Sequence, residues 1–126
     1  MRFRWESDNI ERFLFQSDLA ITAGGIAAYE ALCSGTPLLA LSYDRLQHAT
    51  IKALASSRAC IDLGFGDELD PSELAKTLSL VDADVEIRKL LSCRGRQIVD
   101  GQGARRVAEI IRQSVHKGST TACRRL

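Results

Sequence analysis

Three short, mostly apolar runs follow one another in the first half of the chain, and a segment with helical spacing follows each of them. The runs are Asp18–Thr22, Pro37–Tyr43 and Ala59–Leu63. Their length suits buried strands, and nearly continuous apolar character is typical of strands covered on both faces. Because crossover connections are right-handed, successive strands of this kind lie side by side. The pattern predicts an α/β fold with helices on both faces of a parallel sheet, with the first two runs at its centre and the third beside the second.

Capping residues and breakers mark where the helices begin and end. Asp8 and Glu11 form a capping-box pattern, and Asp70 precedes a proline that suits the first turn of a helix. Gly35 is expected to close the helix that follows the first apolar run. Two helices therefore begin near residues 8 and 70, and others are expected over residues 26–34, 45–57, 85–99 and 104–115.

The remaining segments lack a helical period. Gly64-Phe65-Gly66 is expected to be a loop, and Arg2–Glu6 alternates with two aromatic residues, so it predicts a short strand. Lys117–Leu126 is polar and basic and is expected to be a disordered tail. Because 126 residues are too few for a second core, we expect one domain, or part of one, over residues 1–116 followed by this tail.

Composition excludes several classes of function. The chain has 17 Lys and Arg residues against 16 Asp and Glu residues, a net charge of +1, which argues against a strongly basic nucleic-acid binder. No stretch approaches the ~20 apolar residues that span a bilayer, and the N-terminus has no secretory signal. We therefore expect a cytoplasmic protein that has no membrane span and binds no nucleic acid.

The four cysteines lie far apart and form no Cys-x-x-Cys pair. The usual zinc spacings are therefore absent, and we expect neither a metal nor another cofactor. Without a secretory signal, the cysteines are interpreted as reduced thiols. Cys33 and Cys60 stand among apolar residues and are expected in the core.

The strongest candidate for a binding site is the turn Thr22-Ala23-Gly24-Gly25, which follows the first apolar run. In open parallel sheets, ligands bind beyond the carboxyl ends of the strands. Two glycines let a phosphate approach the backbone, and the next helix directs N–H groups and its positive end at that space. Glu30, on the same helix, can accept hydrogen bonds from ribose hydroxyls. This arrangement predicts a nucleotide site; the alternative is a tight turn followed by a solvated glutamate.

The sequence offers few other candidates for binding or catalytic residues. Neither G-x-G-x-x-G nor the P-loop motif is present, which disfavours a dinucleotide-dependent dehydrogenase and a P-loop NTPase. His48 suits a general base or a phosphate ligand, or else a solvent-facing position on a helix. Asp44 is expected to cap a helix. Arg105 and Arg106 are interpreted as surface charges rather than phosphate ligands.

The block Asp18–Pro37, which reads DLAITAGGIAAYEALCSGTP, resembles the signature of the C-terminal half of GT-B glycosyltransferase-like proteins. The pattern is an Asp-led strand, a small-residue turn, a helix with a fixed glutamate, and Gly-x-Pro before an apolar strand. The UDP-sugar hydrolase of pseudaminic acid synthesis and its spore-coat polysaccharide relatives have this pattern. So does the peptidoglycan N-acetylglucosaminyltransferase, with its glycosyltransferase family 28 type C-terminal domain. Gln47–Ala59 and Val99–Val107 resemble later stretches of these proteins.

The resemblance implies a Rossmann-like domain that binds the UDP part of a UDP-sugar, in a glycosyltransferase or UDP-sugar hydrolase of cell-surface polysaccharide synthesis. By position, Gly24 and Gly25 would face the diphosphate, Glu30 the ribose, and Gln47 the sugar or the pyrophosphate. Family members usually place a serine or threonine at the start of the following helix to meet a phosphate. Residues 26–28 of this chain are apolar instead.

In GT-B proteins, two Rossmann-like domains face each other across a cleft, and the N-terminal domain usually supplies the catalytic base or the acceptor site. This chain resembles only the C-terminal domain, from about its third strand onward, so we expect a truncated domain whose catalytic residues are unknown. The expected partners are UDP or a UDP-sugar, together with a separate N-terminal half or a second copy joined through an exposed sheet edge. The alternative is a Rossmann-like remnant or binding module without turnover.

Overall fold

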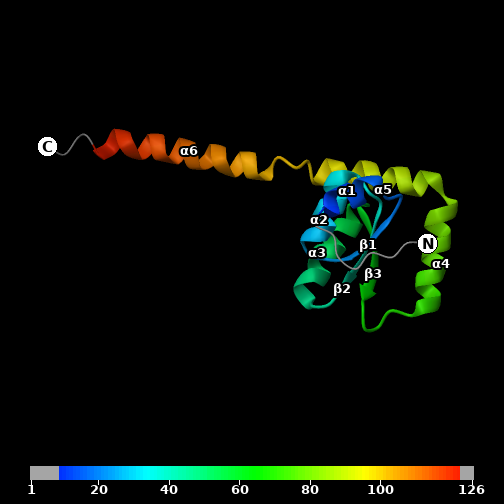
Figure 1. The fold of residues 1–126 in the computed structure, drawn as a ribbon. Helices are drawn as coiled ribbons and strands as arrows, with labels where there is room; N and C mark the ends of the chain where they lie inside the picture. The colour runs from blue at the N-terminus through cyan, green and yellow to red at the C-terminus, as the bar shows by residue number, and fades with distance from the viewer. Residues whose placement is uncertain (1–8, 123–126) are drawn as a thin grey trace.

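A computed structural model of the chain describes residues 9–122 and confirms the predicted α/β architecture (Figure 1). Its three parallel strands are β1 (Ala20–Ala23), β2 (Leu38–Ser42) and β3 (Cys60–Phe65), in the order β1-β2-β3. The predicted strand Arg2–Glu6 and the predicted cap Asp8 lie outside the described residues.

Six helices accompany these strands in the described part of the chain. α2 connects β1 to β2, and α3 connects β2 to β3. Figure 1 shows α2 and α3 on one side of the strands and α4 on the other, so the sheet is the middle of three layers. The helices are α1 (Ile10–Gln16), α2 (Ile26–Ser34), α3 (Arg45–Ser56), α4 (Pro71–Ala83), α5 (Val85–Ile98) and α6 (Gly103–Ala122).

The pairing within the sheet corrects one expectation. Among the described strands β1 pairs with β2, and a central position for β1 stays a prediction because the predicted strand Arg2–Glu6 lies outside the described residues. Gly64-Phe65 is not a loop: β3 continues to Phe65, which pairs with Ser42 after a register shift at which β3 has one residue more than β2. Gly64 has a φ of +78°, a conformation that glycine adopts without the steric cost of a Cβ, and this lets the strand bend there.

The core lies between the sheet and the helices α1, α2 and α3. α2 packs against α1 and α5 as well as against the strands. Small residues on α2 let this helix approach the sheet closely, and leucines and isoleucines fill the remaining space. The members of this cluster are Leu14, Ala20, Ala28, Ala31, Leu32, Leu38, Ala40, Ile51, Leu54, Ala59 and Cys60.

One cysteine differs from its prediction. Cys60 is buried as expected, whereas Cys33 is exposed. Cys33 lies on the last turn of α2, on the outward face of a helix whose inward face is formed by Ala28, Ala31 and Leu32. Burial raises the pKa of the Cys60 thiol to about 11, with a smaller contribution from the nearby Asp62 carboxylate.

Side-chain caps start four of the helices. The carboxylates of Asp44, Asp70 and Asp84 accept backbone N–H groups at the starts of α3, α4 and α5. α1 is capped by Asn9, whose side chain accepts the Arg12 N–H, so this helix begins one residue later than the capping-box pattern predicts. Gly35 closes α2 in the left-handed conformation, as expected, with a φ of +75°.

The last helix, α6, extends away from the rest of the molecule (Figure 1). It is 20 residues long and continues to Ala122, so it includes the first part of the segment predicted as a tail. Its apolar residues Val107, Ile110, Ile111 and Val115 are all exposed. Within the described residues, no helix has the length and apolar character needed to cross a membrane.

Candidate functional site

The candidate site lies where β1 and β2 end and α2 and α3 begin. Gly24 directly follows β1, and its N–H donates to the Leu41 carbonyl of β2 at 3.0 Å. This bond holds the Gly24-Gly25 turn against the end of β2, from which the chain continues to the cap of α3. Parallel strands therefore bring the two helix starts together at the carboxyl end of the sheet, as the sequence predicts.

Between these helix starts is an open cavity of about 330 Å³. It is lined by both predicted glycines and by the predicted glutamine, together with other residues near the starts of α2 and α3. The lining residues are Gly24, Gly25, Ile26, Tyr29, Asp44, Leu46, Gln47 and Thr50.

The two glycines of the turn have different surroundings. A Cβ added to Gly24 would lie 2.7 Å from Cδ1 of Ile51 and 3.3 Å from Cβ of Gln47. Gly24 is thus required for the close packing of α3 against the turn, whether or not a ligand binds. A Cβ added to Gly25 would meet no heavy atom within 4 Å, so Gly25 faces the open space of the cavity.

The start of α2 has no side-chain cap, unlike the starts of α1, α3, α4 and α5. Its N-cap residue is Gly25, which has no side chain to accept the first N–H groups of the helix. The Ala28 N–H donates to the Gly25 carbonyl at 3.1 Å, which leaves the N–H groups of Ile26 and Ala27 ahead of the helical ladder. These groups and the positive end of the helix favour an anion in the adjoining cavity.

Two polar residues of the opposite wall also shape the start of α3. The Asp44 carboxylate accepts the Gln47 N–H at 2.8 Å, which is the capping role predicted for it. The Gln47 side-chain oxygen accepts the Tyr43 N–H at 3.1 Å and so holds that side chain at the cavity. The Gln47 amide nitrogen is then the group of this side chain that can donate to a ligand.

Four other predicted site residues do not line this cavity: Thr22, Ala23, Glu30 and His48. Thr22 and Ala23 lie at the end of β1, where the Thr22 hydroxyl donates to the Ala23 carbonyl at 3.0 Å. Glu30 is half-buried and follows the cavity residue Tyr29 on α2.

The His48 side chain contacts Phe65 and Ser42 outside the cavity. Its ring stacks on the ring of Phe65 with centroids 4.5 Å apart, and its Nδ1 lies 3.4 Å from the hydroxyl oxygen of buried Ser42. The histidine thus packs between the ends of β2 and β3. His48 is therefore half-buried rather than fully solvent-facing, and its role as a general base or phosphate ligand stays a prediction.

Apolar walls are the feature of the site that the sequence analysis missed. Ile26 is 79% exposed and Leu46 is 80% exposed, although both are large apolar residues at the cavity, and Tyr29 is 43% exposed. Exposed apolar groups gathered at a hollow are typical of a surface that contacts a ligand or a partner. The available signal was the position of these residues in the first turns of two helices that begin at the carboxyl ends of neighbouring strands.

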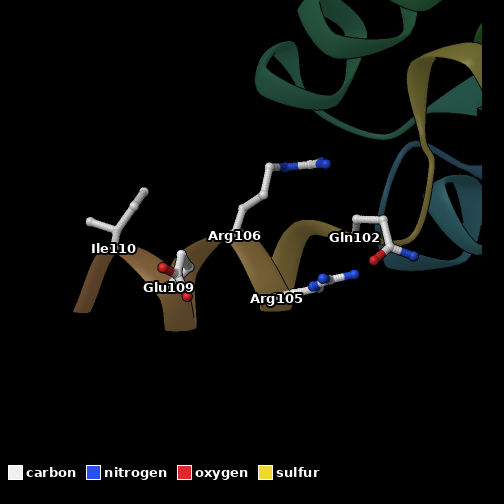
Figure 2. Close-up of a pocket in the computed structure, with 5 residues that line it drawn as sticks. All are labelled: Gln102, Arg105, Arg106, Glu109 and Ile110. Atoms are coloured by element: carbon white, nitrogen blue, oxygen red, sulfur yellow. The ribbon is translucent and has the colours of Figure 1, made fainter. Parts of the chain in front are cut away.

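A second hollow, of about 500 Å³, lies along the first turns of α6 (Figure 2). Figure 2 shows Arg105 and Arg106 extending from α6 towards its start, where Gln102 precedes the helix. Arg106 donates two hydrogen bonds to the Asp100 carboxylate, at 2.7 and 2.9 Å, and this pairing lowers the pKa of Asp100 to about 2. All residues around this hollow belong to α6 or its start, so it is the flank of one helix rather than an enclosed site.

Comparison with known proteins supports one branch of the predicted resemblance. The chain is 38% identical over 106 residues to the spore coat polysaccharide biosynthesis protein SpsG of Bacillus subtilis (strain 168). The matched part covers 84% of this chain and 31% of SpsG, so the chain spans about a third of the length of this relative. No protein-family model matches the chain, and no solved structure matches it.

Proposed function

We propose that the cavity between α2 and α3 binds the diphosphate of a nucleotide-sugar, with UDP-sugars as the ligand class. The observation that carries this proposal is the uncapped start of α2, which opens into the cavity beside Gly25. A phosphate there would accept the N–H groups of Ile26 and Ala27 and lie at the positive end of the helix. This contact needs no serine or threonine hydroxyl, so the apolar residues 26–28 remain compatible with it.

The walls suit the rest of such a ligand. A bare phosphate would leave Ile26, Tyr29 and Leu46 exposed, whereas a base or a sugar ring gives them an apolar or aromatic face to contact. The Gln47 amide nitrogen can donate to a sugar hydroxyl or to the diphosphate. Glu30 is proposed to bind the ribose hydroxyls, which requires the ribose to reach beyond Tyr29 along α2.

The similarity to SpsG suggests the setting of this binding. We propose that the chain is the nucleotide-sugar-binding portion of a glycosyltransferase or UDP-sugar hydrolase that acts in cell-surface polysaccharide biosynthesis. Because the chain spans about a third of that relative, the groups that carry out the chemistry are proposed to come from additional polypeptide, on a longer chain or a separate one.

The second candidate function is binding without turnover. It is favoured by two ionisable groups: Asp44 in the cavity wall is used as a helix cap, and His48, outside the cavity, is packed against Phe65 and Ser42. Of the residues that line the cavity, only Asp44 and Tyr29 are ionisable. Both candidates require nucleotide binding by this chain, and they differ in whether an added catalytic half produces turnover.

Isothermal titration of the full chain with UDP, UDP-N-acetylglucosamine and inorganic pyrophosphate tests the binding proposal. Gly25→Asp puts a carboxylate at the N-cap of α2, where it satisfies the N–H groups and repels a phosphate, so binding should be lost. Gly103→Asp is the matched control, because a Cβ at Gly103 also meets no heavy atom within 4 Å and the charge change is the same. This control should bind as the wild type does.

Each outcome of that titration is informative. Binding of UDP and its sugar, abolished by Gly25→Asp alone, supports the site. A wild-type chain that binds none of the three ligands overturns the proposal and favours a remnant. UDP affinity that Gly25→Asp leaves unchanged places the nucleotide elsewhere. Equal affinity for UDP and pyrophosphate would show that the apolar walls contribute nothing.

A further inference from the structure

The last residue of β2, Ser42, carries a fully buried hydroxyl. Among the described residues this hydroxyl has one hydrogen-bond partner, Nδ1 of His48 at 3.4 Å. A buried hydroxyl needs an acceptor for its O–H, because a desolvated donor without a partner costs free energy. The Ser42 O–H therefore donates to the lone pair of Nδ1.

This hydrogen bond determines which ring nitrogen of His48 carries the proton. A neutral imidazole has one N–H and one bare nitrogen, and the bond made by one nitrogen fixes the state of the other. Because Nδ1 accepts from Ser42, the proton of the neutral ring is on Nε2. Stacking on Phe65, with 24° between the ring planes, holds the ring in this orientation.

The Nε2 atom of His48 is open to solvent. Every buried side-chain nitrogen or oxygen in the described part of the chain has a hydrogen-bond partner. The His48 side chain makes its one hydrogen bond there through Nδ1, and the residue is half-buried. Nε2 is therefore not among the buried atoms, and its N–H can donate to a further group. The preceding residue, Gln47, lines the cavity between α2 and α3.

We propose that Ser42 is a positioning residue that keeps the proton of His48 on Nε2, and that His48 donates this N–H to an oxygen of the bound nucleotide-sugar. The donor role rests on the nucleotide-sugar binding proposed above. The acceptor is an oxygen of the diphosphate or of the sugar. A ring held in this way cannot act as a general base, because Ser42 occupies the lone pair of Nδ1 and Nε2 already carries a proton.

Nitrogen-15 NMR of the free chain tests the tautomer without any ligand. Protonated and bare ring nitrogens have well-separated shifts, and His116→Gln identifies the signals of His48, because the chain has two histidines. In alkaline solution we expect the proton on Nε2 alone in the wild type and a mixture of both tautomers in Ser42→Ala. Thr36→Val is the matched control: it removes another buried hydroxyl, which donates to the Leu14 carbonyl, and should leave His48 unchanged.

Calorimetric titration of the full chain with UDP and UDP-N-acetylglucosamine tests the donor role. His48→Phe keeps a ring that can stack on Phe65 but removes the N–H, so it should weaken binding of the UDP-sugar by about 3- to 10-fold. His48→Gln supplies an amide N–H in place of Nε2 and should retain most of the affinity. Ser42→Ala should weaken binding in the wild-type background but not in His48→Phe, because its effect passes through the histidine. Circular dichroism checks that each variant is folded.

The possible results separate this proposal from the proposed function. A wild type that binds neither ligand overturns the proposed function and the donor role, and the NMR result still decides the pairing of Ser42 with His48. A proton on Nδ1 in the wild type, or a single tautomer kept in Ser42→Ala, overturns the positioning role. So does an effect of Ser42→Ala on affinity that persists in His48→Phe.

The His48→Phe variant by itself decides the donor role. Unchanged affinity in this variant overturns that role even though the ligand binds. A loss for UDP-N-acetylglucosamine alone supports it and assigns the acceptor to the sugar. An equal loss for UDP supports it and assigns the acceptor to the diphosphate.

Discussion

At Gly24 an added Cβ would lie 2.7 Å from Cδ1 of Ile51, whereas at Gly25 it would meet no heavy atom within 4 Å. Two identical neighbours in the sequence thus have separate roles, one in packing and one at the proposed binding surface. Individual contacts also determine the position of His48, which stacks on Phe65 and lies close to the hydroxyl of Ser42. Single side chains of this kind decide what the turn can bind.

The pair of glycines gives a direct prediction about stability. Gly24→Ala should lower the free energy of unfolding by about 1–3 kcal/mol, because the buried side chain of Ile51 must shift to accommodate the methyl group. Gly25→Ala should cost less, since it removes only the mild preference of the N-cap for glycine over alanine. Urea unfolding of the two variants measures the difference. Equal midpoints would show that Ile51 yields without cost and that Gly24 is not needed for packing.

Glu30 gives a prediction about ligand binding. Glu30→Ala should weaken UDP binding more than Arg112→Ala, by up to about 1.5–3 kcal/mol for each lost hydrogen bond to a charged acceptor. Arg112 is a suitable control because it is paired with Glu109 on α6, away from the cavity. Calorimetric titration compares the two variants. If both bind UDP equally well, Glu30 does not contact the ribose.

At the level of elements, the start of each helix determines what can happen beside it. α3, α4 and α5 begin under aspartate carboxylates that occupy their first N–H groups, and α2 begins under a glycine that does not. An anion can therefore take the place of a cap at α2 without displacing a side chain. The connection from α5 to α6 is held differently, by the ion pair of Asp100 and Arg106.

That ion pair makes a pH-dependent prediction. Hydrogen bonds from Arg106 lower the Asp100 pKa from 3.8 to about 2, so the folded state favours the charged carboxylate. The contribution of the pair to stability is present above the ordinary pKa and is lost as the pH falls from about 4 towards 2. NMR titration should find the Asp100 midpoint near 2 in the wild type. In Arg106→Gln the midpoint should return towards about 3.9, the ordinary value for aspartate.

This titration distinguishes two causes of the lowered Asp100 pKa, the Arg106 side chain and the Gln102 N–H. A midpoint that Arg106→Gln leaves unchanged would assign the shift to the Gln102 N–H, which also donates to Asp100. Because the pair is exposed, its effect on overall stability should be small and should decrease with added salt.

At the scale of the whole molecule, one buried core supports the three described strands and the helices α1, α2 and α3. The cavity opens at the carboxyl ends of β1 and β2, where α2 and α3 begin. The proposed ligand surface therefore rests on elements that the core holds in place.

Much of the fold was predictable from local signals alone. The strands Leu38–Ser42 and Cys60–Phe65 begin within a residue or two of the predicted runs, because strand-length apolar segments record burial in the sequence itself. The starts of α3, α4 and α5 follow from capping aspartates, which act on backbone N–H groups only a few residues away. The end of α2 follows from Gly35 for the same reason.

Contacts between distant segments were decided only by the tertiary structure. No local pattern shows that Ile51 packs on Gly24 or that Phe65 stacks on His48. Gly24 and Gly25 were predicted as a site because ligands bind beyond the carboxyl ends of parallel strands, a rule of topology, and Gln47 was added by the resemblance to GT-B proteins. The sequence did not predict the apolar walls or the orientation of His48, because side-chain packing depends on neighbours that folding brings together from separate parts of the chain.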